Sequence, residues 1–286
     1  MPVDMRDLTA DLAAESADLR AMVAGLDAEG WRSPTPAAGW TIADQVSHLA
    51  FFDDAAVSAA TEPGDFAARL ERPAADGELT PDDVAERYRS LPAAELLAWF
   101  DRARRRLIEV FSGLDPAARL PWFGLPMSAA SAATARIMET WAHGQDIADA
   151  LGLVRKPTPR LRHIAHLGVR ALPYSFGARG LDMPAEPVRV ELTGPAGDLW
   201  SWGPDDAENR VTGPALDFCL LVTQRRHRDD TALRAEGPVA QRWLTIAQAF
   251  AGPPGAGRRP AGQAPAADRR AGGAAGTGRG QAPGTG

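Results

Sequence analysis

Hydrophobic side chains in the first half of the chain recur at the spacing of an α-helix. Residues 5–27 and residues 93–113 each place leucines and other apolar residues on one stripe. Thr41, with Asp44 three residues later, forms a capping box and predicts a helix start there. A further helix is predicted over residues 128–152. Four helices of this length, joined by short to moderate loops, indicate a four-helix bundle.

The pattern changes after residue 155, where helical and alternating stretches follow each other closely. Residues 188–194 alternate apolar and polar side chains with period 2, as a strand does, and residues 197–204 read as its hairpin partner. The other predicted elements are helices over residues 161–172, 213–226 and 238–252, and a short strand over residues 232–237. Together they predict a small α+β domain after the bundle.

These elements divide the chain into three predicted parts. Residues 1–155 form the bundle and residues 156–251 a linker helix with the α+β domain. From Gly252 to the end there is no Val, Ile, Leu, Met or aromatic residue, so residues 252–286 are expected to be a disordered tail. The predicted fold class is therefore mostly α.

The tail hides the acidity of the rest of the chain. The whole sequence has a formal net charge of −6, and residues 252–286 hold five arginines and one aspartate, a contribution of +4. Residues 1–251 thus carry −10. Because binding to a phosphate backbone needs clustered positive charge, the body is not expected to bind nucleic acid.

Other bulk features place the chain in an ordinary reducing compartment. A single cysteine, Cys219, excludes an internal disulfide framework. The N-terminal residues lack the apolar core of a signal peptide, and no apolar run approaches the length of a membrane span. We therefore expect a cytoplasmic protein without a membrane anchor; its oligomeric state stays open.

The fourth predicted helix carries a narrow polar stripe. Glu139 and His143 are four residues apart and Asp146 lies three residues further on, so all three share one helix face. Alanines border this stripe, while the large apolar side chains point elsewhere. Two interpretations are open: a solvated face, or a polar cavity inside the bundle in which small neighbours leave room for a ligand.

His48, on the helix that Thr41 caps, extends the second interpretation. If the second and fourth helices face each other, His48, Glu139 and His143 supply two imidazoles and a carboxylate. That donor set suits Zn²⁺ or another divalent metal with an open coordination position. Asp44 and Asp146 could then accept hydrogen bonds from the imidazoles and orient them. The alternative is that His48 is simply a residue at the edge of the core.

Two segments carry a resemblance to a known family: residues 39–50, with Trp40 and His48, and residues 138–152, with Glu139, His143 and Asp146. They resemble the DinB-like bundle superfamily and, more narrowly, the mycothiol-dependent maleylpyruvate isomerase family. The resemblance covers roughly residues 5–251. It implies a metal-binding four-helix bundle, a small C-terminal domain similar to sterol carrier proteins, and His48, Glu139 and His143 as the metal ligands.

The resemblance also implies a chemistry. In that family a metal activates the thiol of mycothiol, the thiolate adds to a conjugated cis double bond, and rotation and elimination give the trans isomer. An arginine of the C-terminal domain is associated with the activity, and Arg225 and Arg226 are the candidates here. A guanidinium group can hold a substrate carboxylate with two hydrogen bonds. The alternative is that both arginines merely stabilise the end of a helix.

The remaining reactive residue types are expected to have no part in the chemistry. Cys219 lies among apolar residues and is expected to be buried and inert, so a reacting thiol would come from a small molecule. His163 and His166 are interpreted as structural or exposed, and His227 as a turn residue. The pair Trp122 and Phe123, just before the fourth helix, is a candidate for the mouth of a pocket.

Three functional hypotheses follow. The first is an enzyme that uses zinc and mycothiol as an isomerase or S-transferase on a small unsaturated or electrophilic carboxylate. The second is a metal-binding or apolar-ligand carrier without turnover. The third is a metal-dependent hydrolase of a thiol conjugate.

Overall fold

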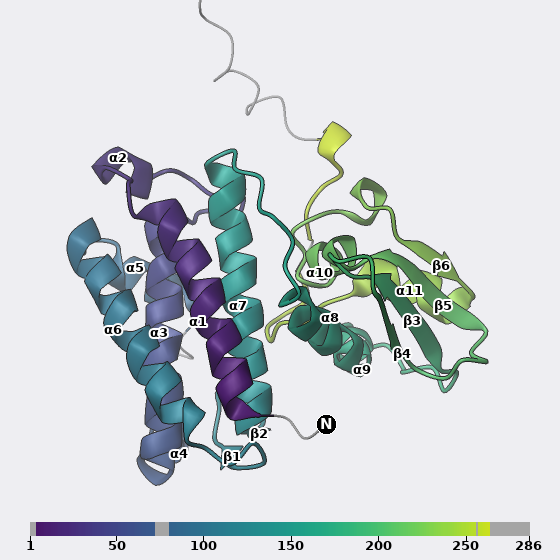
Figure 1. The fold of residues 1–286 in the computed structure, drawn as a ribbon, viewed down its shortest axis with the longest axis horizontal. Helices are drawn as coiled ribbons and strands as arrows, with labels where there is room; N and C mark the ends of the chain where they lie inside the picture. Colours follow the sequence, from purple (N-terminus) through teal and green to yellow (C-terminus); the bar gives the residue numbers. More distant parts are fainter. Residues whose placement is uncertain (1–3, 72–79, 256, 264–286) are drawn as a thin grey trace, which may run out of the picture.

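The computed structural model describes residues 4–71, 80–255 and 257–263. Four long helices stand side by side on one side of the molecule, and a smaller unit of helices and strands packs beside them (Figure 1). The predicted class, a mostly α-helical protein with a bundle followed by a small α+β part, is confirmed. We keep the limits at residues 155 and 251 as a proposed division.

The bundle consists of α1 (Met5–Val23), α3 (Ile42–Thr61), α6 (Ala93–Ser112) and α7 (Ala129–Ala150). The predicted capping box begins α3: the Thr41 hydroxyl accepts from the Asp44 backbone N–H, and the Asp44 carboxylate accepts from that of Thr41. Three short helices join or flank the bundle, namely α2 (Ala28–Trp31), α4 (Pro63–Glu71) and α5 (Pro81–Tyr88). Before α7 the chain makes a small hairpin of β1 (Arg119–Leu120) and β2 (Met127–Ser128).

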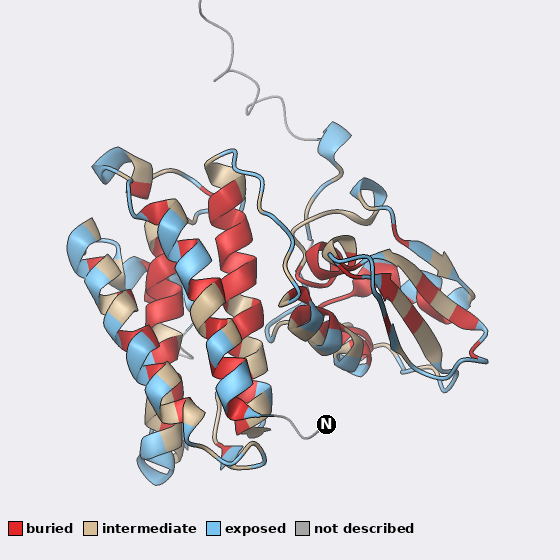
Figure 2. Ribbon diagram, in the orientation of Figure 1, coloured by how far each residue is buried: buried red, intermediate tan, exposed pale blue. Residues whose placement is uncertain are grey.

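The bundle core contains an ionic cluster among its apolar side chains. Asp53 of α3 is fully buried and binds two buried arginines, Arg104 of α6 and Arg136 of α7. Figure 2 shows that nearly the whole length of α7 is buried, since the bundle covers one side of it and the C-terminal unit the other. The ion cluster therefore ties three of the four long helices together at the centre.

The C-terminal unit begins with α8 (Leu161–Arg170) and α9 (Leu172–Gly177) and then forms a four-stranded sheet. Its strands, in the spatial order β4-β3-β5-β6, are β3 (Val188–Thr193), β4 (Leu199–Trp202), β5 (Asn209–Pro214) and β6 (Arg234–Glu236). The other elements of the C-terminal unit are α10 (Ala215–Val222), the 3-10 turn η1 (Arg228–Asp230) and α11 (Pro238–Ile246). The predicted hairpin is present, with β3 antiparallel to β4.

Three local predictions differ from the structure, and the first is the helix predicted over residues 238–252, which ends at Ile246. The strand β5, which runs parallel to β3, was not predicted, and its last two residues were assigned to the following helix. The predicted helix over residues 161–172 is broken at Ala171, where a short second helix begins.

The segment predicted to be a disordered tail is described as far as residue 263, apart from residue 256. Within it, Gly252 exchanges hydrogen bonds with the Tyr174 hydroxyl, and η2 (Ala261–Gln263) is a single 3-10 turn. Residues 264–286 lie outside the described part. Among the described residues, no helix combines the length and the apolar character that a membrane crossing needs.

Candidate metal centre

Three side chains from two helices converge at one point of the bundle. His48 comes from α3, and Glu139 and His143 come from successive turns of α7. The Glu139 Oε2 atom lies 3.1 Å from His143 Nε2 and 3.6 Å from His48 Nε2. One ligand atom of each residue lies within 4.8 Å of those of the other two. The structure thus brings together the three residues that the sequence analysis proposed as metal ligands.

The ionic cluster holds the two helices in the register that this convergence needs. Arg136, three residues before Glu139, donates to Asp53 of α3 at 3.0 Å and to the Leu49 carbonyl oxygen at 3.3 Å. Both bonds cross from α7 to α3 within about one turn of the cluster of His48, Glu139 and His143. The separation of His48 on α3 from Glu139 and His143 on α7 is therefore fixed by buried polar contacts as well as by packing.

Burial and mutual contact set the charges in the cluster. Burial and the neighbouring charge of His143 lower the pKa of His48 to about 4, so its imidazole is neutral at pH 7. Burial alone would raise the pKa of Glu139, but hydrogen bonds and charge from the two histidines hold it well below its usual range. The Glu139 carboxylate is thus ionised and the His48 imidazole neutral, and a divalent cation between them could bind both groups.

Gln45 is a partner of the cluster that the sequence analysis missed. Its Oε1 atom accepts a hydrogen bond from His143 Nδ1, and its own amide donates to the Thr35 hydroxyl at 2.8 Å. Thr35 in turn donates to the Trp40 carbonyl oxygen at 2.9 Å. Because the Gln45 oxygen can only accept, His143 Nδ1 carries a proton, so Nε2 is the ring nitrogen that faces Glu139 and could bind a metal. The only sequence signal was a glutamine one turn before His48.

We expect Gln45→Leu to weaken metal binding without removing it. The change keeps the side-chain volume but takes away the acceptor that fixes the ring of His143. Loss of such an outer partner typically costs about 10–100-fold in metal affinity. Competition titration with a chromophoric chelator measures the change. Gln241→Leu, in the C-terminal unit, is the matched control, and an affinity unchanged by Gln45→Leu would contradict the prediction.

The two carboxylates predicted to orient the imidazoles bind elsewhere. Asp44 closes the capping box with Thr41, and its carboxylate also accepts from Arg89 at 3.2 Å. Asp146 accepts from Arg225 at 2.8 Å and from Arg258 at 2.5 Å. Among the described residues, neither carboxylate accepts a hydrogen bond from an imidazole, so that prediction is corrected. The start of α3 and Arg89 occupy the Asp44 carboxylate, and two arginines occupy that of Asp146. His48 Nδ1 has no hydrogen-bond partner among the described residues.

The two predicted catalytic arginines lie at the contact between α7 and the C-terminal unit. Arg225 is bound by Asp146, and Arg226 holds Asp149 with two bonds of 2.6 and 2.8 Å. Both aspartates follow His143 on α7. The arginines are therefore within two turns of the cluster along α7, but their guanidinium groups are occupied by carboxylates.

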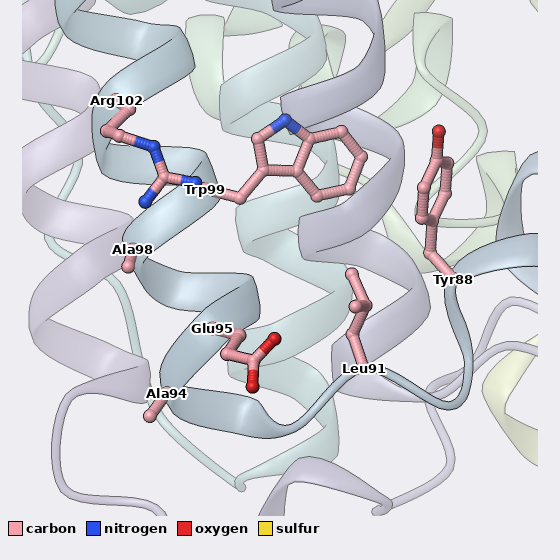
Figure 3. Close-up of a pocket in the computed structure, with 7 residues that line it drawn as sticks. All are labelled: Tyr88, Leu91, Ala94, Glu95, Ala98, Trp99 and Arg102. Carbon is pink, nitrogen blue, oxygen red and sulfur yellow. The ribbon is translucent and has the colours of Figure 1, made fainter.

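The other histidines lie away from the cluster. His163 binds Asp11, His166 accepts from the Trp202 indole, and His227 caps the turn η1. The surface hollow in Figure 3, about 410 Å³, is also elsewhere. It lies on α5 and α6 and is lined by Tyr88, Leu91, Ala94, Glu95, Ala98, Trp99 and Arg102.

Cys219 is fully buried in α10, and burial raises the pKa of its thiol far above the usual range. Because the thiolate is the reactive form, we expect Cys219 to react with a disulfide reagent such as Ellman's reagent at least ~100-fold more slowly in the folded protein than in urea. The absorbance of the released aryl thiolate follows the reaction, and free cysteine serves as the control for reagent quality. Rapid reaction of the native protein would contradict the placement.

The chain is similar to known proteins in its bundle and over most of its length. Residues 12–148 match the mycothiol maleylpyruvate isomerase N-terminal domain, and residues 184–236 match a family described as wyosine base formation. "Uncharacterized protein MT0041" and "Uncharacterized protein Rv0036c" of Mycobacterium tuberculosis are each 55% identical over 255 residues, 89% of this chain and 99% of theirs.

Solved structures give the same fold. Crystal structures of the mycothiol-dependent maleylpyruvate isomerase and of a histidine-to-alanine mutant of it match with a TM-score of 0.56. The match covers 83% of this chain and 96% of theirs, at 15% sequence identity, so this likeness concerns the fold. The sequence match over residues 12–148 shows that the bundle belongs to the family of the mycothiol maleylpyruvate isomerase N-terminal domain.

Proposed function

We propose that this protein is a metal-dependent enzyme that uses a low-molecular-weight thiol, mycothiol or a thiol like it, to modify a small electrophile. The reaction would be an S-transfer or a cis–trans isomerisation. One observation carries the proposal: two imidazole nitrogens and a carboxylate oxygen converge between α3 and α7. Three protein donors leave a coordination position for a substrate, which is the arrangement of catalytic metal sites.

His48, Glu139 and His143 would hold the metal. A bound divalent cation would lower the pKa of a thiol and present it as a nucleophile. The donor set suits Zn²⁺, and it also suits Fe²⁺, Ni²⁺ and Mn²⁺. Glu139 would contribute one negative charge, and Gln45 would keep the ring of His143 in place through its Nδ1 proton. The indole of Trp40 stacks on His143 at 5.9 Å and shields it from one side.

The thiol nucleophile would come from a small molecule and not from the chain itself. Cys219, the only cysteine, is buried in α10 and cannot meet a substrate. For Arg225 and Arg226 we propose a positioning role. Since they bind Asp146 and Asp149, they hold the C-terminal unit against α7 close to the cluster.

Metal analysis followed by a thiol assay tests the proposal. The purified full chain should hold about one equivalent of a divalent metal, as expected for a site of three protein ligands. With mycothiol and an electrophile it should form a conjugate or an isomer, detected by mass spectrometry. A protein without stoichiometric metal would overturn the proposal at its first step.

The same measurements separate the alternatives. Bound metal with retained lipid in a native mass spectrum, and no thiol consumption, would indicate a carrier. Cleavage of a thiol conjugate supplied as substrate, without conjugate formation, would indicate a hydrolase that uses metal-activated water.

A further inference from the structure

Aromatic rings surround one side of the metal centre and continue away from it. We call Trp40, Phe52, Phe66, Trp122 and Phe123 the aromatic wall. Two of its members contact the ligands: the Phe52 ring lies 4.6 Å from the His48 ring, and Trp40 lies 5.3 Å from His48. The wall therefore begins at the proposed ligands themselves.

The rest of the wall comes from two other segments. Phe123, in the loop between β1 and β2, lies 5.5 Å from Phe52, and its neighbour Trp122 lies 6.2 Å from Phe52. Phe66 of α4 completes the set, with its ring 6.1 Å from Trp122 and 5.6 Å from Phe123. Three segments of the chain thus place their rings in one continuous apolar cluster, in which Phe66 is buried and Phe123 lies at the surface.

The aromatic wall reaches solvent. Phe123 is 39% exposed, and Leu125, two residues later in the same loop, is 86% exposed. Large apolar side chains gathered at a surface, next to converging polar groups, are typical of a ligand site. Here the converging polar groups are the ligands of the metal centre, so the apolar surface lies where a substrate of that centre would rest.

Charge points to the same kind of ligand. Two cations beside the cluster are already bound by carboxylates: Arg136 by Asp53, and Arg225 by Asp146. Arg69 donates to the Ser58 hydroxyl and lies over Phe66, whose ring contacts are with Trp122 and Phe123, so this cation is at the end of the wall away from the proposed ligands. A divalent cation, the Glu139 carboxylate and a thiolate sum to zero charge, so the occupied site has no net charge to attract a substrate anion.

We propose that the electrophile is an uncharged molecule with a planar apolar group, and that this group lies on the aromatic wall. This inference rests on the proposed function, and it replaces the carboxylate expected from the sequence with an uncharged, apolar electrophile. For an activated alkene the thiol adds across the double bond. A new S–C bond forms at one carbon, the thiol proton ends on the other, and no further reactant is needed.

Binding of an unreactive probe tests the wall separately from catalysis. N-phenylsuccinimide is the saturated form of the thiol acceptor N-phenylmaleimide, and N-(4-carboxyphenyl)succinimide adds one negative charge. Equilibrium dialysis against the full chain should show saturable binding of the uncharged probe and weaker binding of the charged one. Phe123→Ala should weaken binding of the uncharged probe about fivefold, because an aromatic face is lost.

Leu199→Ala is the matched control, since Leu199 is an exposed apolar residue on β4. It should bind the probe as the unaltered protein does. Three results would overturn the inference: no saturable binding of the uncharged probe, tighter binding of the carboxylated probe, or equal binding by the Phe123→Ala and Leu199→Ala variants.

Catalysis is measured in a second arm. With mycothiol present, the ratio of kcat/KM for N-phenylmaleimide to that for its carboxylated form should exceed one and should fall in the Phe123→Ala variant. Probe binding without stoichiometric metal or conjugate formation would leave the wall standing and reject the proposed function. Metal binding together with turnover that favours the carboxylated acceptor would support the proposed function and reject the inference about the aromatic wall.

Discussion

Replacing His143 with alanine is expected to abolish stoichiometric metal binding. The variant loses one of the three proposed metal ligands, and it also leaves Gln45 without the ring nitrogen that it holds. Loss of an outer partner alone costs about 10–100-fold in affinity, and loss of a direct ligand costs more. Elemental analysis after dialysis, with calorimetric titration of Zn²⁺, gives the measurement.

The chain offers a close control for this experiment. His163 is also a helical histidine bound to a carboxylate, Asp11, but it lies on α8 outside the cluster. His163→Ala should keep the full metal content. A second variant, Glu139→Gln, keeps the shape of the side chain and removes its charge, so a fall in affinity there cannot be attributed to a cavity. The prediction is contradicted if His143→Ala still holds one equivalent of metal.

The part of the site that lies on one helix was predictable from the sequence. Glu139 and His143 are four residues apart, which puts them on one face of any helix. The start of α3 was predictable for the same reason, because the capping box of Thr41 and Asp44 is a local interaction. Joining His48 to the other two needed the family resemblance, since spacing alone does not say which helices face each other.

The partners of these residues were not predictable, because they are set by tertiary contacts. Asp146 has the right spacing to serve His143, but Arg225, 79 residues away in sequence, is placed beside it by the docking of α10. Gln45 has no distinctive pattern, and only the closeness of α7 turns it into an acceptor for His143. Strand β5 was missed on similar grounds, since its pairing with β3, a tertiary contact, is what stabilises it.

The ionic cluster of the bundle core leads to the second large expected effect, a loss of stability in Asp53→Ala. Asp53 is fully buried and accepts from Arg104 at 2.6 Å and from Arg136 at 3.0 Å. Without it, two guanidinium groups stay in the core with no carboxylate partner from this cluster. Removing one partner from a buried ion pair typically costs about 3–5 kcal/mol, a large part of the ~5–15 kcal/mol that stabilises a folded domain.

Urea unfolding, followed by circular dichroism, measures this loss, and Asp101→Ala is the control. Asp101 also binds an arginine, Arg20, but its side chain is 28% exposed and that of Arg20 48%. An exposed pair of this kind contributes about 0–1 kcal/mol, so the two aspartates should differ several-fold in effect. Similar unfolding free energies for the two variants would show that the core pair is not needed. Asp53 also holds Arg136, which lies three residues before Glu139 on α7. Asp53→Ala should therefore also weaken metal binding at temperatures where the variant is still folded. That result would tie the stability of the core to the geometry of the metal centre.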